Sequence, residues 1–298
     1  IRDSSYVDFI TGEGGVIDTW LRRGAAGFRL DVADELPDEF IEKIRTAVKR
    51  VGPEKFLLGE VWEDATTKYG FNQRRTYLLG KGLDSVMNYP FKNAVLDFVK
   101  GKPAEQAANE ILTICEHYPA PAIDTALNFL STHDTERALT VIADEPANGR
   151  GRQWQSGRCV TGDAYEEGLL RLRMAYAIIY TLPGVPCLYY GDEIAMQGYR
   201  DPFNRAFFRW DAHEQRLRPV LAQLAQLRHT CEAFRTGKLW VLRAEGGILH
   251  YQRIGEVETA EIIVNRTEHI IVETLASGKS TEVNPMGFTI VVEEVGHN

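Results

Sequence analysis

Three short apolar segments of the chain each end in a carboxylate. The segments are residues 27–31, 56–60 and 126–134, which end in Asp31, Glu60 and Asp134. Hydrolysis of a glycosidic bond uses two carboxyl groups, one ionised and one protonated, with roughly 5 Å between them in the retaining reaction. A third carboxylate can bind sugar hydroxyls as the ring flattens. The residue types therefore predict a site for cleavage of sugar chains.

Arg29 precedes Asp31 by two residues in the first segment. On a strand this spacing places both side chains on one face. A fixed cation at that distance keeps a carboxylate ionised, so we expect Asp31 to be the nucleophile and Glu60 to be the proton donor. Taken alone, the segment also fits a solvated strand end with a surface ion pair.

Apolar strands that end in charge are typical of the C-terminal mouth of a parallel β-barrel. Alternating strand and helix patterns along the chain predict parallel βα units and an α/β fold. The expected strands are residues 27–31, 56–61, 85–89, 126–131 and 186–189. The expected helices are residues 6–23, 37–50, 91–100, 104–117, 164–181 and 213–231.

The pattern changes beyond Gly237, where short β-branched runs alternate with turn residues. The runs are residues 239–242, 248–251, 261–264, 270–272 and 288–292. Such runs predict a small antiparallel β-sandwich. We therefore expect a barrel domain over residues 1–234 and an all-β domain over residues 235–298.

Four segments, in this order, resemble the motifs of the alpha-amylase family, glycoside hydrolase family 13. They are residues 27–31, 59–62, 131–134 and 184–193. The resemblance covers about residues 7–210 and narrows toward the neopullulanase, cyclomaltodextrinase and maltogenic amylase group, with residues 84–91 similar to that group's sixth strand. The group follows its nucleophile with Val-Ala-Asn-Glu, whereas this chain has Asp34 in place of the Asn.

The family resemblance implies a (β/α)8 TIM barrel, of which this chain carries the last five βα units. It also implies that Asp31 is the nucleophile, Glu60 the acid/base and Asp134 the carboxylate that stabilises the transition state. The substrate-binding residues that it implies are Arg29, Glu35, Trp62, His133, Asp201 and Arg205. The expected reaction is retaining hydrolysis of α-1,4-glucosidic bonds in maltooligosaccharides, cyclodextrins, pullulan or starch.

Several alternatives remain open at this level. An acceptor sugar in place of water would give transglycosylation or isomerisation at the same intermediate. A non-catalytic barrel of the amino-acid-transporter heavy-chain kind would have lost its acids, and the three acids retained here argue against it. Trp62 also fits a core residue, Glu35 also fits the first acid of a helix, and Asp192 with Glu193 fits a structural role better than a metal site.

Composition narrows the partners and the setting. A net charge of −8 and a pI near 5.5 argue against nucleic-acid binding, and no apolar run approaches the roughly 20 residues of a membrane span. The cysteines are far apart, which favours reduced thiols and a cytoplasmic setting; they are Cys115, Cys159, Cys187 and Cys231. We expect an α-glucan oligosaccharide as partner and no required cofactor, with calcium left open.

The chain begins at Ile1 without a methionine, and the family's first motif is missing. We therefore expect a chain truncated at its start. Five parallel strands cannot close a barrel as eight do, and open sheet edges favour pairing with another copy. The isolated chain is accordingly expected to form a homodimer or an aggregation-prone fragment. That it binds sugar or self-associates without catalysing a reaction stays open as an alternative.

Overall fold

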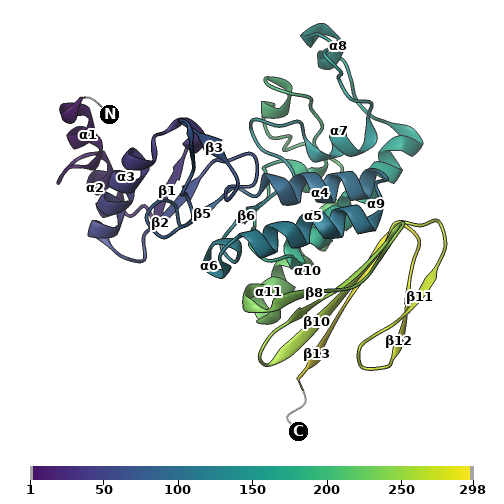
Figure 1. Ribbon diagram of the computed structural model, residues 1–298. Coiled ribbons are helices and arrows are strands. Elements are labelled where there is room, and N and C mark those ends of the chain that lie inside the picture. Colours follow the sequence, from purple (N-terminus) through teal and green to yellow (C-terminus); the bar gives the residue numbers. More distant parts are fainter. Residues whose placement is uncertain (1–2, 296–298) are drawn as a thin grey trace. The chain divides into compact units, whose positions relative to one another are not determined.

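The computed structural model describes residues 3–295 and divides the chain into two compact units. The first unit comprises Ile1–Pro90 and Thr113–Leu127, and the second comprises Phe91–Leu112 and Asn128–Asn298. Each unit has its own sheets and helices (Figure 1).

A three-stranded parallel sheet of order β1-β2-β5 forms the centre of the first unit. Its strands are β1 (Gly27–Leu30), β2 (Phe56–Gly59) and β5 (Ser85–Val86). Leu30 lies opposite Gly59 in the ladder, so Asp31 and Glu60 follow their strands at the same edge of the sheet. The helices that lie wholly in this unit are α1 (Ser4–Thr11), α2 (Val16–Arg22), α3 (Asp38–Val51) and α6 (Ala120–Ile123), whereas α5 (Ala104–His117) begins in the second unit and only its residues 113–117 belong to the first.

The single helix expected over residues 6–23 is wrong, because two helices with a break at residues 12–15 occupy this segment. The first helix ends at Thr11, where the C-cap Gly12 is extended with φ −66° and ψ 166°. Gly14 then adopts the left-handed φ of 73°, and its N–H donates to Asp18 Oδ2 at 3.1 Å. A short hairpin of β3 (Tyr69–Gly70) and β4 (Gln73–Arg74) was not expected either.

The remaining two strands of the parallel series are β6 (Leu127–Asn128) and β7 (Val185–Pro186), which pair with each other. Both are shorter than expected. After β6, the Thr132 N–H donates to Thr135 Oγ1 at 3.1 Å, and the Asp134 N–H donates to Thr132 Oγ1 at 3.1 Å. These side-chain acceptors replace ladder partners, so the chain leaves the sheet before His133.

Helices account for most of the second unit before its antiparallel sheets. They are α4 (Tyr89–Lys100), of which residues 89 and 90 belong to the first unit, α7 (Ala138–Ala143), α8 (Arg152–Ser156), α9 (Gly162–Thr181), α10 (Leu217–Thr230) and α11 (Ala233–Thr236), with the 3₁₀ turns η2 (Asp192–Ile194) and η3 (Phe203–Arg205). The expected strand over residues 85–89 is too long, because Tyr89 already begins α4. The expected helix over residues 213–231 begins later, at Leu217.

An antiparallel region follows α11, as the sequence predicts. Strands β8 (Lys238–Glu245), β9 (Ile248–Ile254), β10 (Glu258–Asn265) and β13 (Gly287–Glu294) form a sheet of order β13-β10-β9-β8, while β11 (Ile271–Thr274) pairs with β12 (Ser280–Val283). Strand β12 was missed because its sequence Ser-Thr-Glu-Val is mostly polar. The domain boundary expected at residues 234/235 stays a prediction.

Asp84 ties α3 to β2 and so holds the sheet that carries Asp31. Its carboxylate accepts hydrogen bonds from Arg45 Nη1 at 2.7 Å, Lys49 Nζ at 2.8 Å and the Leu57 N–H at 2.8 Å. Burial raises the pKa of Asp84, but these three donors outweigh burial and the net pKa lies below the ordinary value. A carboxyl group whose pKa is lower in the folded protein than in the unfolded chain stabilises the fold at pH values above its unfolded pKa. This stabilisation is lost as the pH falls through the pKa of the folded state.

Asp84→Asn should therefore lower the free energy of unfolding at pH 7 by about 2 kcal/mol, less than the ~3–5 kcal/mol of a fully buried pair. The difference from wild type should narrow as the pH falls below about 4, the ordinary pKa of an aspartate in the unfolded chain, and through the lower pKa of folded Asp84. Urea titrations at several pH values measure it. Asp97→Asn breaks the exposed pair with Lys102 and serves as control. A pH-independent difference would contradict the explanation.

Candidate active site

The Glu60 carboxyl group is buried and held on both oxygens. Its side chain is 3% exposed. Oε1 accepts from Trp62 Nε1 at 3.1 Å and from the Tyr89 hydroxyl at 3.3 Å. Oε2 accepts from the Val32 N–H at 2.9 Å and lies 3.0 Å from Arg29 Nη2. The carboxyl group is thus oriented by groups from four separate positions.

Asp31 lies beside this group but is open to solvent, with its side chain 73% exposed. Arg29 Nη1 hydrogen-bonds to Asp31 Oδ1 while Nη2 of the same guanidinium contacts Glu60, so one cation joins both carboxylates. Val32 has φ 41°, and this left-handed turn directs its N–H toward Glu60. The structure confirms that Arg29 and Asp31 share a face, and it brings both next to Glu60.

Trp62 is 43% exposed, which contradicts the alternative of a core residue. Its ring is stacked on Tyr89 with centroids 4.5 Å apart and planes at 12°. Glu35 is exposed and ends η1 (Ala33–Glu35), three residues before α3 begins at Asp38. Contact of Trp62 and Glu35 with substrate stays a prediction.

Arg75 was missed by sequence analysis, although it holds the segment that follows Asp31. Its side chain is fully buried and donates from Nε to Asp38 Oδ1 at 2.7 Å and from Nη1 to the Asp34 carbonyl at 2.7 Å. Lys68 Nζ lies 3.3 Å from Asp34 Oδ2, an ion pair that the amide of an Asn at this position could not form. The departure at Asp34 therefore adds a charge contact in this loop.

The second unit brings four of the predicted residues together. His133 Nε2 lies 2.9 Å from Asp134 Oδ2, and Arg205 Nη2 lies 3.3 Å from Asp134 Oδ1. Arg205 Nε donates to the His133 carbonyl at 2.9 Å and lies 3.1 Å from Asp201 Oδ1. The side chains of this cluster are between 30% and 54% exposed, so they are accessible to a ligand.

Asn204 fixes the loop of that cluster and was not singled out by the sequence. It is fully buried, and its Nδ2 lies within hydrogen-bond distance of three carbonyl oxygens, those of Thr132 at 3.3 Å, His133 at 2.8 Å and Thr135 at 2.8 Å. In the sequence, only its position between Asp201 and Arg205, in the predicted sugar-binding loop, pointed to a role for Asn204.

Asp192 is buried among hydrogen-bond donors of the protein, which agrees with the structural role that the sequence favoured. It is 2% exposed and accepts hydrogen bonds from Arg137 Nη1 at 3.1 Å and the Tyr176 hydroxyl at 2.7 Å. Burial raises the pKa of Asp192 despite these donors, and burial also raises the pKa of Tyr176. Within residues 3–295, no group of three or more His, Cys, Asp or Glu side chains is arranged to hold a metal ion.

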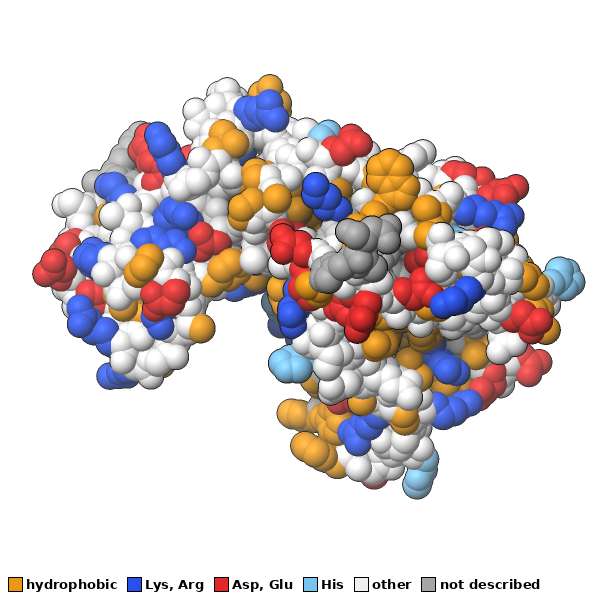
Figure 2. Space-filling model, turned by 90° about the horizontal axis from the view of Figure 1, so that it is seen from below, with side chains coloured by type: hydrophobic (Ala, Val, Ile, Leu, Met, Phe, Trp, Pro, Cys, Tyr) orange, Lys and Arg blue, Asp and Glu red, His pale blue; other side chains and the backbone are white. Residues whose placement is uncertain are grey.

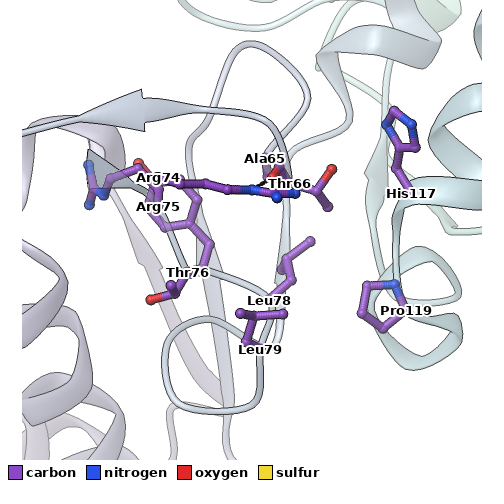
Figure 3. Close-up of a pocket in the computed structure, with 10 residues that line it drawn as sticks. Ala65, Thr66, Arg74, Arg75, Thr76, Leu78, Leu79, His117 and Pro119 are labelled. Carbon is purple, nitrogen blue, oxygen red and sulfur yellow. Dashed lines mark hydrogen bonds between the residues drawn. The ribbon is translucent and has the colours of Figure 1, made fainter. Parts of the chain in front are cut away.

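A pocket of about 280 Å³ lies elsewhere in the first unit. Figure 3 shows His117 and Pro119 on one side of it and Thr66 and Arg74 across from them. None of the predicted site residues lines this pocket. It therefore adds nothing to the carboxylate site.

The face of the molecule drawn in Figure 2 carries charges of both signs. Figure 2 shows Lys and Arg side chains interspersed with Asp and Glu on the visible face of each unit. Among the helices described here, none combines the length and apolar character needed to cross a bilayer.

The adjacent parallel strands β1 and β2 carry an arginine-linked pair of carboxylates at their C-terminal ends, an arrangement typical of the active-site face of a TIM barrel. The family model for the catalytic domain of alpha amylase matches residues 10–247. The chain belongs to the alpha-amylase family, glycoside hydrolase family 13, and its parallel strands are part of that family's TIM barrel.

The chain is similar to several characterised relatives. It is 33% identical over 255 residues to a cyclomaltodextrinase of Geobacillus thermopakistaniensis, covering 83% of this chain and 38% of that protein. It is 32% identical over 272 residues to an amylopullulanase of Thermoanaerobacter thermohydrosulfuricus, covering 84% of this chain and 17% of that protein. The cyclic alpha-maltosyl-(1→6)-maltose hydrolase of Arthrobacter globiformis shares the fold, with a TM-score of 0.79 at 24% identity over 98% of this chain and 59% of that one. The chain thus spans less than two thirds of these relatives' length.

Proposed function

We propose that this chain carries the catalytic groups of a retaining glycoside hydrolase that cleaves α-1,4-glucosidic bonds in maltooligosaccharides, cyclodextrins, pullulan or starch. The observation that carries the proposal is the Arg29 guanidinium, which joins exposed Asp31 to buried Glu60 at the ends of adjacent parallel strands. The names of the relatives, a cyclomaltodextrinase and an amylopullulanase, support the substrate class.

The two carboxyl groups have different surroundings, and these suit different steps. Exposed Asp31 attacks the anomeric carbon while Glu60 donates its proton to the leaving glycosidic oxygen, which breaks the bond and forms a covalent glycosyl-enzyme. Glu60 then takes a proton from water, and the water oxygen displaces Asp31 from the sugar. Arg29 balances the negative charge that Asp31 carries before the first displacement and regains after the second. No cofactor enters this scheme, because carboxyl groups supply both the nucleophile and the proton.

The cluster of the second unit supplies hydroxyl ligands in this proposal. Asp134 and His133 bind sugar hydroxyls as the ring distorts, and Arg205 with Asp201 binds the sugar on the non-reducing side of the cut. A carboxylate paired with a histidine or an arginine offers both acceptors and donors, which a sugar diol requires.

The stereochemistry of the product tests the proposal. Two displacements at the anomeric carbon restore its configuration, so the first product of β-cyclodextrin or maltotetraose cleavage should be the α-anomer. Proton NMR of the full-length natural protein with substrate, recorded before mutarotation equilibrates the anomers, distinguishes the two. A β-anomer formed first would exclude Asp31 as nucleophile. A reaction left to equilibrium, measured in parallel, gives the reference anomer ratio.

A further inference from the structure

We propose that Tyr89 is a positioning residue for Glu60, acting through its own hydroxyl and through the Trp62 indole. This inference rests on the proposed function, because it assigns Tyr89 the task of holding the acid/base in place. Nothing in the relatives' names or in the family match assigns a role to this tyrosine.

Two aromatic side chains converge on one oxygen of Glu60. The Tyr89 hydroxyl lies 3.3 Å from Oε1, and Trp62 Nε1 lies 3.1 Å from the same atom. Their rings are stacked at 4.5 Å and 12°. The two donors and the shared acceptor therefore form a closed arrangement, in which movement of any one group strains contacts to the other two.

The two aromatic residues differ in how firmly each is held. Tyr89 is 2% exposed, whereas Trp62 is 43% exposed. An indole with that exposure would sample other rotamers if nothing fixed its face. Stacking on the buried phenol restricts the indole to the orientation in which Nε1 meets Glu60.

The backbone around Tyr89 is fixed at the end of β5. The Asn88 N–H donates to the Leu127 carbonyl at 2.9 Å, and Met87 forms a parallel bridge with Leu127. The Tyr89 N–H donates to the Met87 carbonyl at 3.1 Å as α4 begins. The phenol is therefore carried by a backbone segment that hydrogen bonds hold next to Leu127, which suits a group that must orient another.

Positioning matters because a proton donor acts only within hydrogen-bond reach of the oxygen that it protonates. The Val32 N–H and Arg29 already contact Oε2. The orientation of the carboxyl group therefore depends further on the two donors to Oε1. Small displacements of such a group lower turnover more than substrate binding.

The test separates the hydroxyl from the ring. In the full-length natural protein acting on β-cyclodextrin, Tyr89→Phe should lower kcat about tenfold, with KM within about twofold of wild type. Tyr89→Leu removes the stack as well and should lower kcat about a hundredfold. Tyr118→Phe is the matched control, since this buried hydroxyl accepts from the Ala65 N–H at 3.0 Å and is not among the groups that hold Glu60. It should keep wild-type kcat.

A second readout does not depend on activity. The indole N–H resonance of Trp62 in ¹⁵N-labelled protein, assigned by its loss in Trp62→Phe, reports the hydrogen bond to Glu60. The chemical shift of this resonance should change in Glu60→Gln and in Tyr89→Leu, and it should stay the same in Tyr118→Phe. Wild-type kcat in both Tyr89 variants, or an indole resonance that Tyr89→Leu leaves unmoved, would overturn the inference. A wild-type protein without activity on α-glucans would overturn the proposed function, while the resonance would still test the role of Tyr89.

Discussion

Glu60→Gln is expected to lower turnover of β-cyclodextrin by about 10²–10⁴-fold while leaving the binding of maltooligosaccharides nearly intact. The amide has almost the same shape as the acid but has no proton to donate to the leaving oxygen. Reducing-sugar release measures turnover, and calorimetric titration with maltoheptaose measures binding. Unchanged turnover would remove Glu60 from the mechanism.

A substrate with a good leaving group separates loss of the acid from loss of the fold. α-Maltosyl fluoride releases fluoride, a leaving group that needs no proton from Glu60. The variant should therefore form the glycosyl-enzyme from this substrate with a much smaller loss of rate. Glu63→Gln is the matched control, because Glu63 is a nearby exposed acid that pairs with Lys68. The control should keep wild-type turnover on both substrates. Equal losses of Glu60→Gln in glucan cleavage and in the first release of fluoride, a step that precedes the use of Glu60 as a base, would indicate damage to the site as a whole.

The largest expected effect on stability comes from Arg137, which is fully buried in the second unit. Its Nη1 donates to Asp192 Oδ1 at 3.1 Å and to the Tyr190 carbonyl at 2.7 Å. Its guanidinium also lies over the rings of Tyr189 and Tyr190 at 4.7 and 4.9 Å. Arg137→Met should lower the free energy of unfolding by about 3–5 kcal/mol, because it leaves the Asp192 carboxylate buried without its cation.

Urea denaturation at pH 7, followed by circular dichroism, measures this loss. Arg137→Met combined with Asp192→Asn should be less damaging than the sum of the two single variants, because the double variant buries no unpaired charge. Arg200→Met is the control, since this side chain is 79% exposed and lies 3.8 Å from Glu136. It should change stability by no more than about 0.5 kcal/mol. Additive losses in the double variant would show that Arg137 stabilises the fold by packing alone.

Much of the secondary structure was predictable because its signals are local. The expected helix over residues 104–117 coincides with α5 (Ala104–His117), whose apolar residues recur at helical spacing. Apolar runs also located β1 and β2, since buried parallel strands require them. Strand ends were less accurate, because side chains such as Thr132 and Thr135 compete for backbone donors in ways that depend on the turn.

The sequence by itself determined which carboxylates follow which strands, and it grouped Asp31 with Arg29, since residues two apart on a strand must share a face. Only the tertiary structure decided which groups surround Glu60. Tyr89 contacts it from 29 positions away, and Arg75 reaches the Asp34 carbonyl from 41 positions away. Neither contact has a local signal, because a hydrogen bond between distant segments is fixed by strand register and side-chain packing rather than by any periodicity along the chain.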